Sequence, residues 1–95
     1  MLAKIPIILE KLNIEDVDKI ILRTAIIAEL DAVNLYEELA SMTSNKDLKK
    51  VLLDIAREEK THVGEFLALL NRKDEEQEKE LEEGKKEVEE ILEED

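Results

Sequence analysis

The chain lacks cysteine, is almost free of proline and glycine, and has very few aromatic residues. Its 95 residues include no Cys, one Pro, two Gly and only two aromatic residues, Tyr36 and Phe66. The absence of Cys excludes a disulfide framework, and the shortage of large rings leaves little material for a bulky core. A chain of this size is therefore expected to depend on association with other copies for its stability.

Long apolar runs and an excess of basic residues are also missing. No stretch approaches the roughly 20 apolar residues that span a bilayer, and the apolar N-terminus lacks the cleavage signature of a signal peptide. We therefore predict a cytoplasmic protein without membrane association.

The formal net charge of −12 argues against nucleic acid as a partner, because its phosphates would be repelled. The abundance of Ile, Glu and Lys is typical of thermophilic proteins.

The acidic excess is concentrated near the C-terminus. Residues 1–73 carry 13 acidic and 11 basic residues, whereas residues 74–95 carry 13 acidic and three basic residues. This shift in composition predicts two parts, a helical hairpin with an N-terminal arm at residues 1–73 and an acidic helix or tail at residues 74–95. The acidic part could attract cations, or it could be a solvated helix, a linker or a docking segment.

Apolar periodicity predicts an all-α fold without strands. The first expected elements are a short amphipathic turn or helix at 5–12 and a long helix at 13–42, which Asn13 caps. A second helix is expected at 44–71, with Ser44 as its cap and Asp47 at its third position. A charged segment follows at 74–92, and Gly84 interrupts it. Because the break between the two long helices is short, they are expected to form an antiparallel hairpin.

Each long helix carries a carboxylate in the middle of its apolar stripe. The residues within about 60° of Glu29 on a helical wheel are all suited to burial. They are Leu22, Ala25, Ile26, Ala32, Val33, Tyr36 and Ala40. On the second helix, Glu59 and His62 interrupt an equivalent stripe, which is formed by Leu48, Leu52, Ile55, Ala56, Val63, Phe66 and Leu70.

These polar side chains are expected to lie at the same height in the hairpin. Glu29 precedes Ser44 by 15 residues and Glu59 follows it by 15, so both fall about 22 Å from the turn. Burying carboxylates without partners is costly, so such residues usually pair or bind a metal. Carboxylate oxygens with one imidazole suit Fe(II) or Mn(II). The sequence therefore predicts that Glu29, Glu59 and His62 bind a metal.

One chain carries half of a dinuclear site. Ferritin-like centres use two Glu-x-x-His motifs and two single Glu residues, one contribution from each of four helices. This chain offers one motif, Glu59 with His62, and one single residue, Glu29. A two-fold axis would complete the site in a homodimer that forms a ferritin-like four-helix bundle, where four carboxylates balance two Fe(II) ions. Alternatively, the hairpin is purely structural, and the Glu and His side chains satisfy one another.

Four further residues are weaker candidates for a role at the metal site. Tyr36 lies two turns after Glu29 on the same face, where it could hydrogen-bond a ligand, donate an electron during catalysis, or simply fill the core. Asp31, Glu58 and Glu65 could support the ligands or hold a weaker metal-transit site, or they could be solvated surface carboxylates.

At these residues the chain resembles the encapsulated ferritin family. The likeness covers roughly residues 20–73 and is strongest in Glu29-Leu-Asp-Ala-Val-Asn-Leu-Tyr36 and in Glu58-Glu-Lys-Thr-His62. The chain departs from some members at Leu35, where they carry an aromatic residue, and at Ala28, where an acid can occur.

The resemblance implies a ferroxidase that oxidises Fe(II) to Fe(III) at a dinuclear iron site shared between two subunits. Its implied ligands are Glu29, Glu59 and His62, with Tyr36 close by and Asp31 near the metal entry. It also implies a decameric ring of dimers that works inside an encapsulin shell, which stores the iron, and in some archaeal members a fusion to the shell protein. A peroxidase or a manganese catalase on the same scaffold stays open as an alternative.

Overall fold

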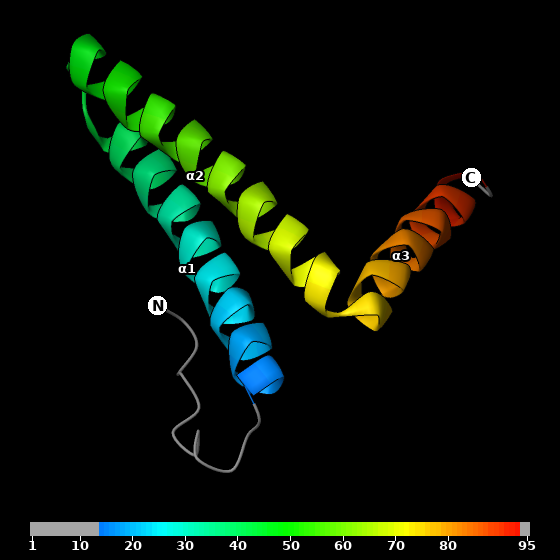
Figure 1. The fold of residues 1–95 in the computed structure, drawn as a ribbon. Coiled ribbons are helices and arrows are strands. Elements are labelled where there is room, and N and C mark those ends of the chain that lie inside the picture. The colour runs from blue at the N-terminus through cyan, green and yellow to red at the C-terminus, as the bar shows by residue number, and fades with distance from the viewer. Residues whose placement is uncertain (1–13, 94–95) are drawn as a thin grey trace.

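The chain forms three α-helices with short connections in the computed structural model (Figure 1). They are α1 (Ile14–Met42), α2 (Lys46–Lys73) and α3 (Glu75–Glu93). The structure describes the backbone of residues 14–93 and the side chains of residues 16–93. This part contains no strand, so the predicted all-α class is confirmed. The predicted helix at 5–12 and the Asn13 cap lie outside the described residues.

Helices α1 and α2 lie side by side and antiparallel, as the short connection predicted (Figure 1). Few of the described side chains of the hairpin are buried, and all of these are aliphatic. They are Leu22, Val33, Ala40, Ala56 and Leu70. Many larger aliphatic side chains remain exposed on the hairpin, including Ile21, Leu39, Val51 and Leu69. A core this thin supports the expectation that the hairpin needs a further surface against which to pack.

The cap of α2 is Asn45, one residue later than the predicted Ser44. The Asn45 side-chain oxygen accepts a hydrogen bond from the Leu48 backbone N–H at 2.9 Å, and α2 begins at Lys46. The prediction of Ser44 was therefore wrong, and Asp47 is the second helical residue. Ser and Asn both favour the cap position. Here the Thr43 hydroxyl accepts a hydrogen bond from the Asn45 N–H at 3.1 Å, and this contact favours Asn45 as the cap.

Asp74 connects all three helices. Its backbone N–H donates to the Leu70 carbonyl at 2.9 Å at the end of α2. Its carboxylate accepts a hydrogen bond from the Gln77 N–H at 3.0 Å at the start of α3, and another from Arg23 of α1 at 2.7 Å. The bond from Gln77, together with nearby Lys19 and Arg23, holds the pKa of Asp74 below its ordinary value, against the opposing effect of burial.

Helix α3 projects from the hairpin at the end opposite the α1–α2 turn (Figure 1). It runs through Gly84 without a break, so the predicted interruption there was wrong. Gly84 costs helix stability but does not force a turn, and none of the described residues has a positive φ. Helix α2 also runs to Lys73, two residues beyond the prediction. The division into two parts at residue 73 stays a prediction.

No helix among the described residues is both long and apolar enough to cross a bilayer.

We expect Asn45→Ala to lower the free energy of unfolding by about 1 kcal/mol, because the first turn of α2 loses its cap. Chemical denaturation followed by circular dichroism at fixed chain concentration measures this change. Asn34→Ala, an exposed position within α1, is the matched control and should not destabilise. Equal losses in the two variants would show that the cap contributes nothing.

We expect Asp74→Asn to destabilise the chain at neutral pH but not in acid. Asparagine keeps the cap but loses the ion pair with Arg23. Because the folded pKa of Asp74 is lowered, its contribution is full above the ordinary carboxyl pKa of about 4 and is lost as the pH falls through the folded value. Unfolding measured in parallel at several pH values tests this. A difference that stays constant into strong acid would contradict it.

Candidate metal centre

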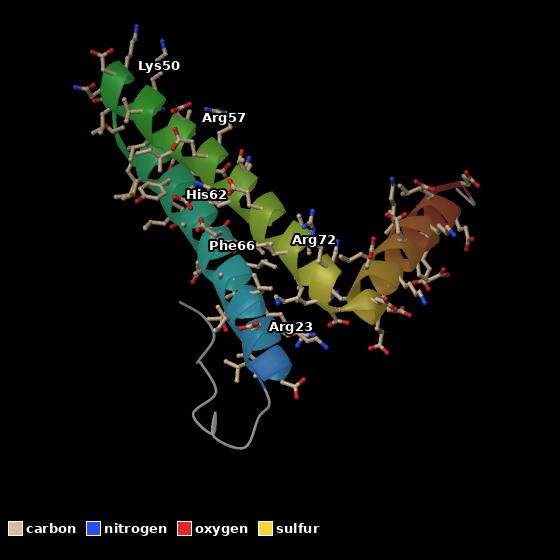
Figure 2. All side chains as sticks on the ribbon, viewed as in Figure 1. Arg23, Lys50, Arg57, His62, Phe66 and Arg72 are labelled. Carbon is tan, nitrogen blue, oxygen red and sulfur yellow. The ribbon has the colours of Figure 1, made fainter. Side chains whose placement is uncertain are left out.

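The three residues predicted to meet do converge in the middle of the hairpin. Glu29 comes from α1, whereas Glu59 and His62 come from α2, one turn apart. One possible ligand atom from each lies within 4.8 Å of the others. In Figure 2 the labelled His62 lies at mid-height, between the two helices. The matched spacing of 15 residues from the turn therefore predicted the juxtaposition correctly.

The contacts centre on one imidazole nitrogen. His62 Nδ1 lies 3.4 Å from Glu29 Oε2 and 3.3 Å from Glu59 Oε2. Both distances exceed the usual length of a charge-assisted N–H···O hydrogen bond. A single ring proton cannot point at both carboxylates, and an unprotonated nitrogen would face two negative oxygens. The three side chains therefore do not form a well-aligned hydrogen bond. Their oxygen and nitrogen atoms are instead arranged around a shared point, as metal ligands are.

Within residues 16–93, no lysine or arginine forms an ion pair with either of these two carboxylates. Four basic side chains pair with other acids instead: Arg23 with Asp74, Arg57 with Asp54, Lys60 with Glu37 and Lys73 with Asp18. Glu29 and Glu59 have only His62 as a partner in this part of the chain. Their side chains are 21% and 18% exposed, so desolvation makes uncompensated negative charge costly.

The donor set fits a divalent cation. Two carboxylate oxygens and one imidazole nitrogen suit Fe(II) or Mn(II) better than a structural zinc, which is usually held by thiolates and imidazoles. A cation at the shared point would supply the missing positive charge and would resolve the conflict at His62 Nδ1. The residues that could hold it are Glu29, Glu59 and His62, and no other such group converges within residues 16–93.

The cluster is open on one side of the hairpin. The His62 side chain is 43% exposed, about twice as much as either carboxylate. On a helical wheel, Val51 and Leu69 fall within about 20° of His62 on the same flank of α2, and both are exposed. Ile21 and Leu39 occupy the corresponding flank of α1 and are exposed as well. We call these four aliphatic residues and the His62 edge the open face.

The residues with weaker signals are not part of the cluster. Tyr36 is half-buried on the same stripe of α1 as Glu29, but no described hydrogen bond joins it to the three candidate ligands. Asp31 lies on the opposite side of α1 from Glu29, about 160° away on a helical wheel, and is half-buried. Glu58 and Glu65 are exposed on α2. Supporting or transit roles for these four residues stay predictions.

Comparison with known proteins identifies the family of this chain. The sequence profile of the rubrerythrin family matches residues 21–94. Over 71 residues, the chain is 59% identical to a ferritin-like–encapsulin shell fusion protein of Pyrococcus furiosus, covering 75% of this chain and 21% of that protein. Over 56 residues, it is 43% identical to the encapsulin nanocompartment cargo protein EncC of Myxococcus xanthus, covering 59% of this chain and 43% of that protein. The chain thus spans less than half of either relative.

A solved structure matches over almost the whole length. The crystal structure of the encapsulated ferritin domain from Pyrococcus furiosus superposes with a TM-score of 0.82 at 49% sequence identity, covering 96% of this chain and 95% of that one. The likeness extends beyond the segments in which the sequence showed it, because it includes the C-terminal helix. The chain therefore belongs to the rubrerythrin family and to the encapsulated ferritins.

Proposed function

We propose that this chain is a ferroxidase that oxidises Fe(II) to Fe(III) at a dinuclear site completed by two subunits. The observation that carries the proposal is the convergence of Glu29, Glu59 and His62, with two carboxylates that have no lysine or arginine partner among the described residues. Membership of the encapsulated ferritins supports it.

Two copies would pair through the open face. A second hairpin packed there would cover the exposed aliphatic side chains and would bring a second Glu29, Glu59 and His62 to the same level. The pair then presents four carboxylates, a charge of −4, which two Fe(II) ions balance. Without metal, the same four carboxylates repel one another across the interface, so metal binding and pairing are coupled.

In the reaction, Fe(II) is the substrate. Each of two bound Fe(II) ions gives up one electron, and dioxygen accepts two electrons and two protons to form hydrogen peroxide. Hydrogen peroxide could serve as the oxidant instead. The protein contributes position and charge: the carboxylates gather the two cations, His62 fixes the edge of the site, and the packed hairpins limit access of other ligands. The Fe(III) product leaves the site for storage. Mn(II) would compete with Fe(II) for the same carboxylate and imidazole ligands.

The relatives suggest where the product goes. Their names describe one protein fused to an encapsulin shell and another that is cargo of an encapsulin nanocompartment. By analogy, we propose that this chain works inside an encapsulin shell in the cytoplasm, in a ring built from dimers, and that the shell holds the oxidised iron. This chain aligns with only one part of the fusion protein, which is compatible with a longer chain that also includes a shell domain.

We expect Glu59→Ala and His62→Ala each to slow the rapid phase of Fe(II) oxidation by at least about 100-fold, because each removes a ligand. Stopped-flow absorbance of Fe(III) measures the rate, and circular dichroism checks that helicity survives. Glu38→Ala removes an exposed carboxylate on the far side of α1 and should keep the wild-type rate.

Two results would refute this assignment. One is wild-type oxidation in both ligand variants. The other is turnover of hydrogen peroxide that is much faster than oxidation of Fe(II), which would favour a peroxidase or a manganese catalase on the same scaffold.

We expect metal to promote dimerisation. Sedimentation velocity under anaerobic conditions should show more dimer with Fe(II), or with a redox-silent divalent ion, than with chelator. The double variant Glu29→Gln/Glu59→Gln removes the charge repulsion, so its dimerisation should no longer depend on metal. If the wild-type assembly were the same with metal and with chelator, the coupling would be absent, and a structural hairpin would be favoured.

A further inference from the structure

Helices α2 and α3 are separated by a single residue, although nothing in the local sequence forbids one continuous helix. Asp74 lies between Lys73 and Glu75 with an extended backbone, at φ −138° and ψ 90°. Residues 70–80 contain neither Pro nor Gly and consist mostly of strong helix formers. Figure 1 shows that α3 nevertheless leaves the end of α2 in a different direction. The bend therefore needs a cause other than a helix-breaking residue.

The bent backbone loses few hydrogen bonds relative to an unbroken helix. In an unbroken helix, the first three N–H groups of α3 would donate to the carbonyls four residues earlier. In the bend, the third of these donors, the Gln77 N–H, instead donates to the Asp74 carboxylate at 3.0 Å. The helical bonds on either side are kept, because Asp74 N–H donates to the Leu70 carbonyl and Glu78 N–H donates to the Asp74 carbonyl. The backbone therefore allows a bent and a straight form that differ at one residue.

The charged residues around the junction suit both forms. The last turn of α2 ends in Arg72 and Lys73. The first turn of α3 carries Glu75, Glu76 and Glu78. In the bent form, each group of charges stabilises the helix end near which it lies. In a straight helix, Arg72 and Glu76 would be four residues apart on one face and would attract each other. Local charge thus does not decide between the two forms.

Packing of α3 against the hairpin does little to hold the bend. None of the described side chains of α3 is buried. A recess of about 250 Å³ remains where the three helices meet. It is lined by Arg23, Ile26, Ile27, Leu67, Leu70 and Gln77. An exposed helix beside such a recess gains little from burial of apolar surface, so its direction depends mainly on polar contacts at its first turn.

The Asp74 carboxylate makes the polar contact that joins this turn to α1. Its Oδ1 atom caps α3 through the Gln77 N–H, while its Oδ2 atom accepts a hydrogen bond from Arg23 Nη2 at 2.7 Å. The Asp74 side chain is 13% exposed, so this charge-assisted bond is partly shielded from water. A continuous helix has no cap at this position, so the carboxylate could not make both bonds there.

We propose that Arg23 and Asp74 form a latch that selects the bent form over a straight form in which α2 and α3 are a single helix. Release of the latch turns α3 into a continuation of α2 and places its exposed apolar residues beyond the end of the hairpin, along the axis of α2. The direction of α3 is then a two-state property that one contact controls. None of the candidate metal ligands takes part in the latch, so its failure would leave the ferroxidase proposal untouched.

A distance between two spin labels tests the latch in the full chain. Because the chain has no Cys, Thr61→Cys and Lys86→Cys provide two unique attachment sites, and both positions are exposed. Labelled chain is mixed with an excess of unlabelled chain, so that double electron–electron resonance reports distances within one chain. In the straight form the two positions lie about 38 Å apart along the helix. The bent form gives a shorter distance.

The unsubstituted latch should give mainly the shorter distance. Arg23→Ala should raise the ratio of the longer to the shorter distance about fivefold, because a partly exposed ion pair is lost. Arg57→Ala is the matched control, since it removes an ion pair of the same 2.7 Å length within α2. It should leave the distances unchanged.

A substitution of the partner residue separates the latch from the cap. Asp74→Asn keeps a capping side chain but loses the ion pair, so it should shift the ratio as Arg23→Ala does. Combining the two substitutions should bring no further shift, because both remove the same contact. Circular dichroism checks that every variant remains helical.

The latch is disproved by any of three results. One is the same distance distribution in Arg23→Ala and in the chain with the intact latch. Another is an equal shift in the Arg57→Ala control. The last is a broad distribution in Arg23→Ala without a peak at the distance of the continuous helix, which would show a flexible joint instead of two states.

Discussion

The convergence of two carboxylates on one imidazole nitrogen is the constraint on which the rest of the structure depends. Glu29 and Glu59 lie opposite each other where a helical hairpin would otherwise be packed with aliphatic side chains. Desolvated negative charges in that position need a compensating cation. Among the described residues, His62 is the one side chain paired with both carboxylates, and its Nδ1 lies 3.4 Å from Glu29 Oε2 and 3.3 Å from Glu59 Oε2. A metal ion bound between them would satisfy all three groups together.

The same constraint explains the thin core and the exposed aliphatic residues. A hairpin that closed tightly around the three polar side chains would leave no room for a metal and no access to it. The open face instead exposes His62 and surrounds it with aliphatic side chains, among them Val51 and Leu69. Burial of these side chains against a second copy would exclude water from the site and strengthen its electrostatic interactions. In the proposed dimer, stability, pairing and metal binding would thus be parts of one physical arrangement.

Much of this arrangement could be predicted from the sequence. Each predicted ligand interrupts an apolar stripe, and the equal spacing of Glu29 and Glu59 from the turn sets their height, so the cluster followed from helix geometry alone. Local details were less predictable. Ser44 and Asn45 are both good cap residues, and a contact from the Thr43 hydroxyl favours the later one. Gly84 is tolerated within α3 because the adjoining residues are helix formers. The contact that joins Asp74, at the start of α3, to Arg23 of α1 links residues 51 positions apart, which periodicity does not encode.

A crystal structure of the protein soaked with Fe(II), with anomalous scattering recorded at the iron absorption edge, tests the central claim most directly. The account predicts two iron positions per pair of chains, each within coordination distance of carboxylate oxygens from Glu29 and Glu59 and close to a His62 imidazole, at the interface between two hairpins. Iron bound only to surface acids such as those of α3, or a cluster of these three side chains that stays free of metal and faces no second chain, would contradict it.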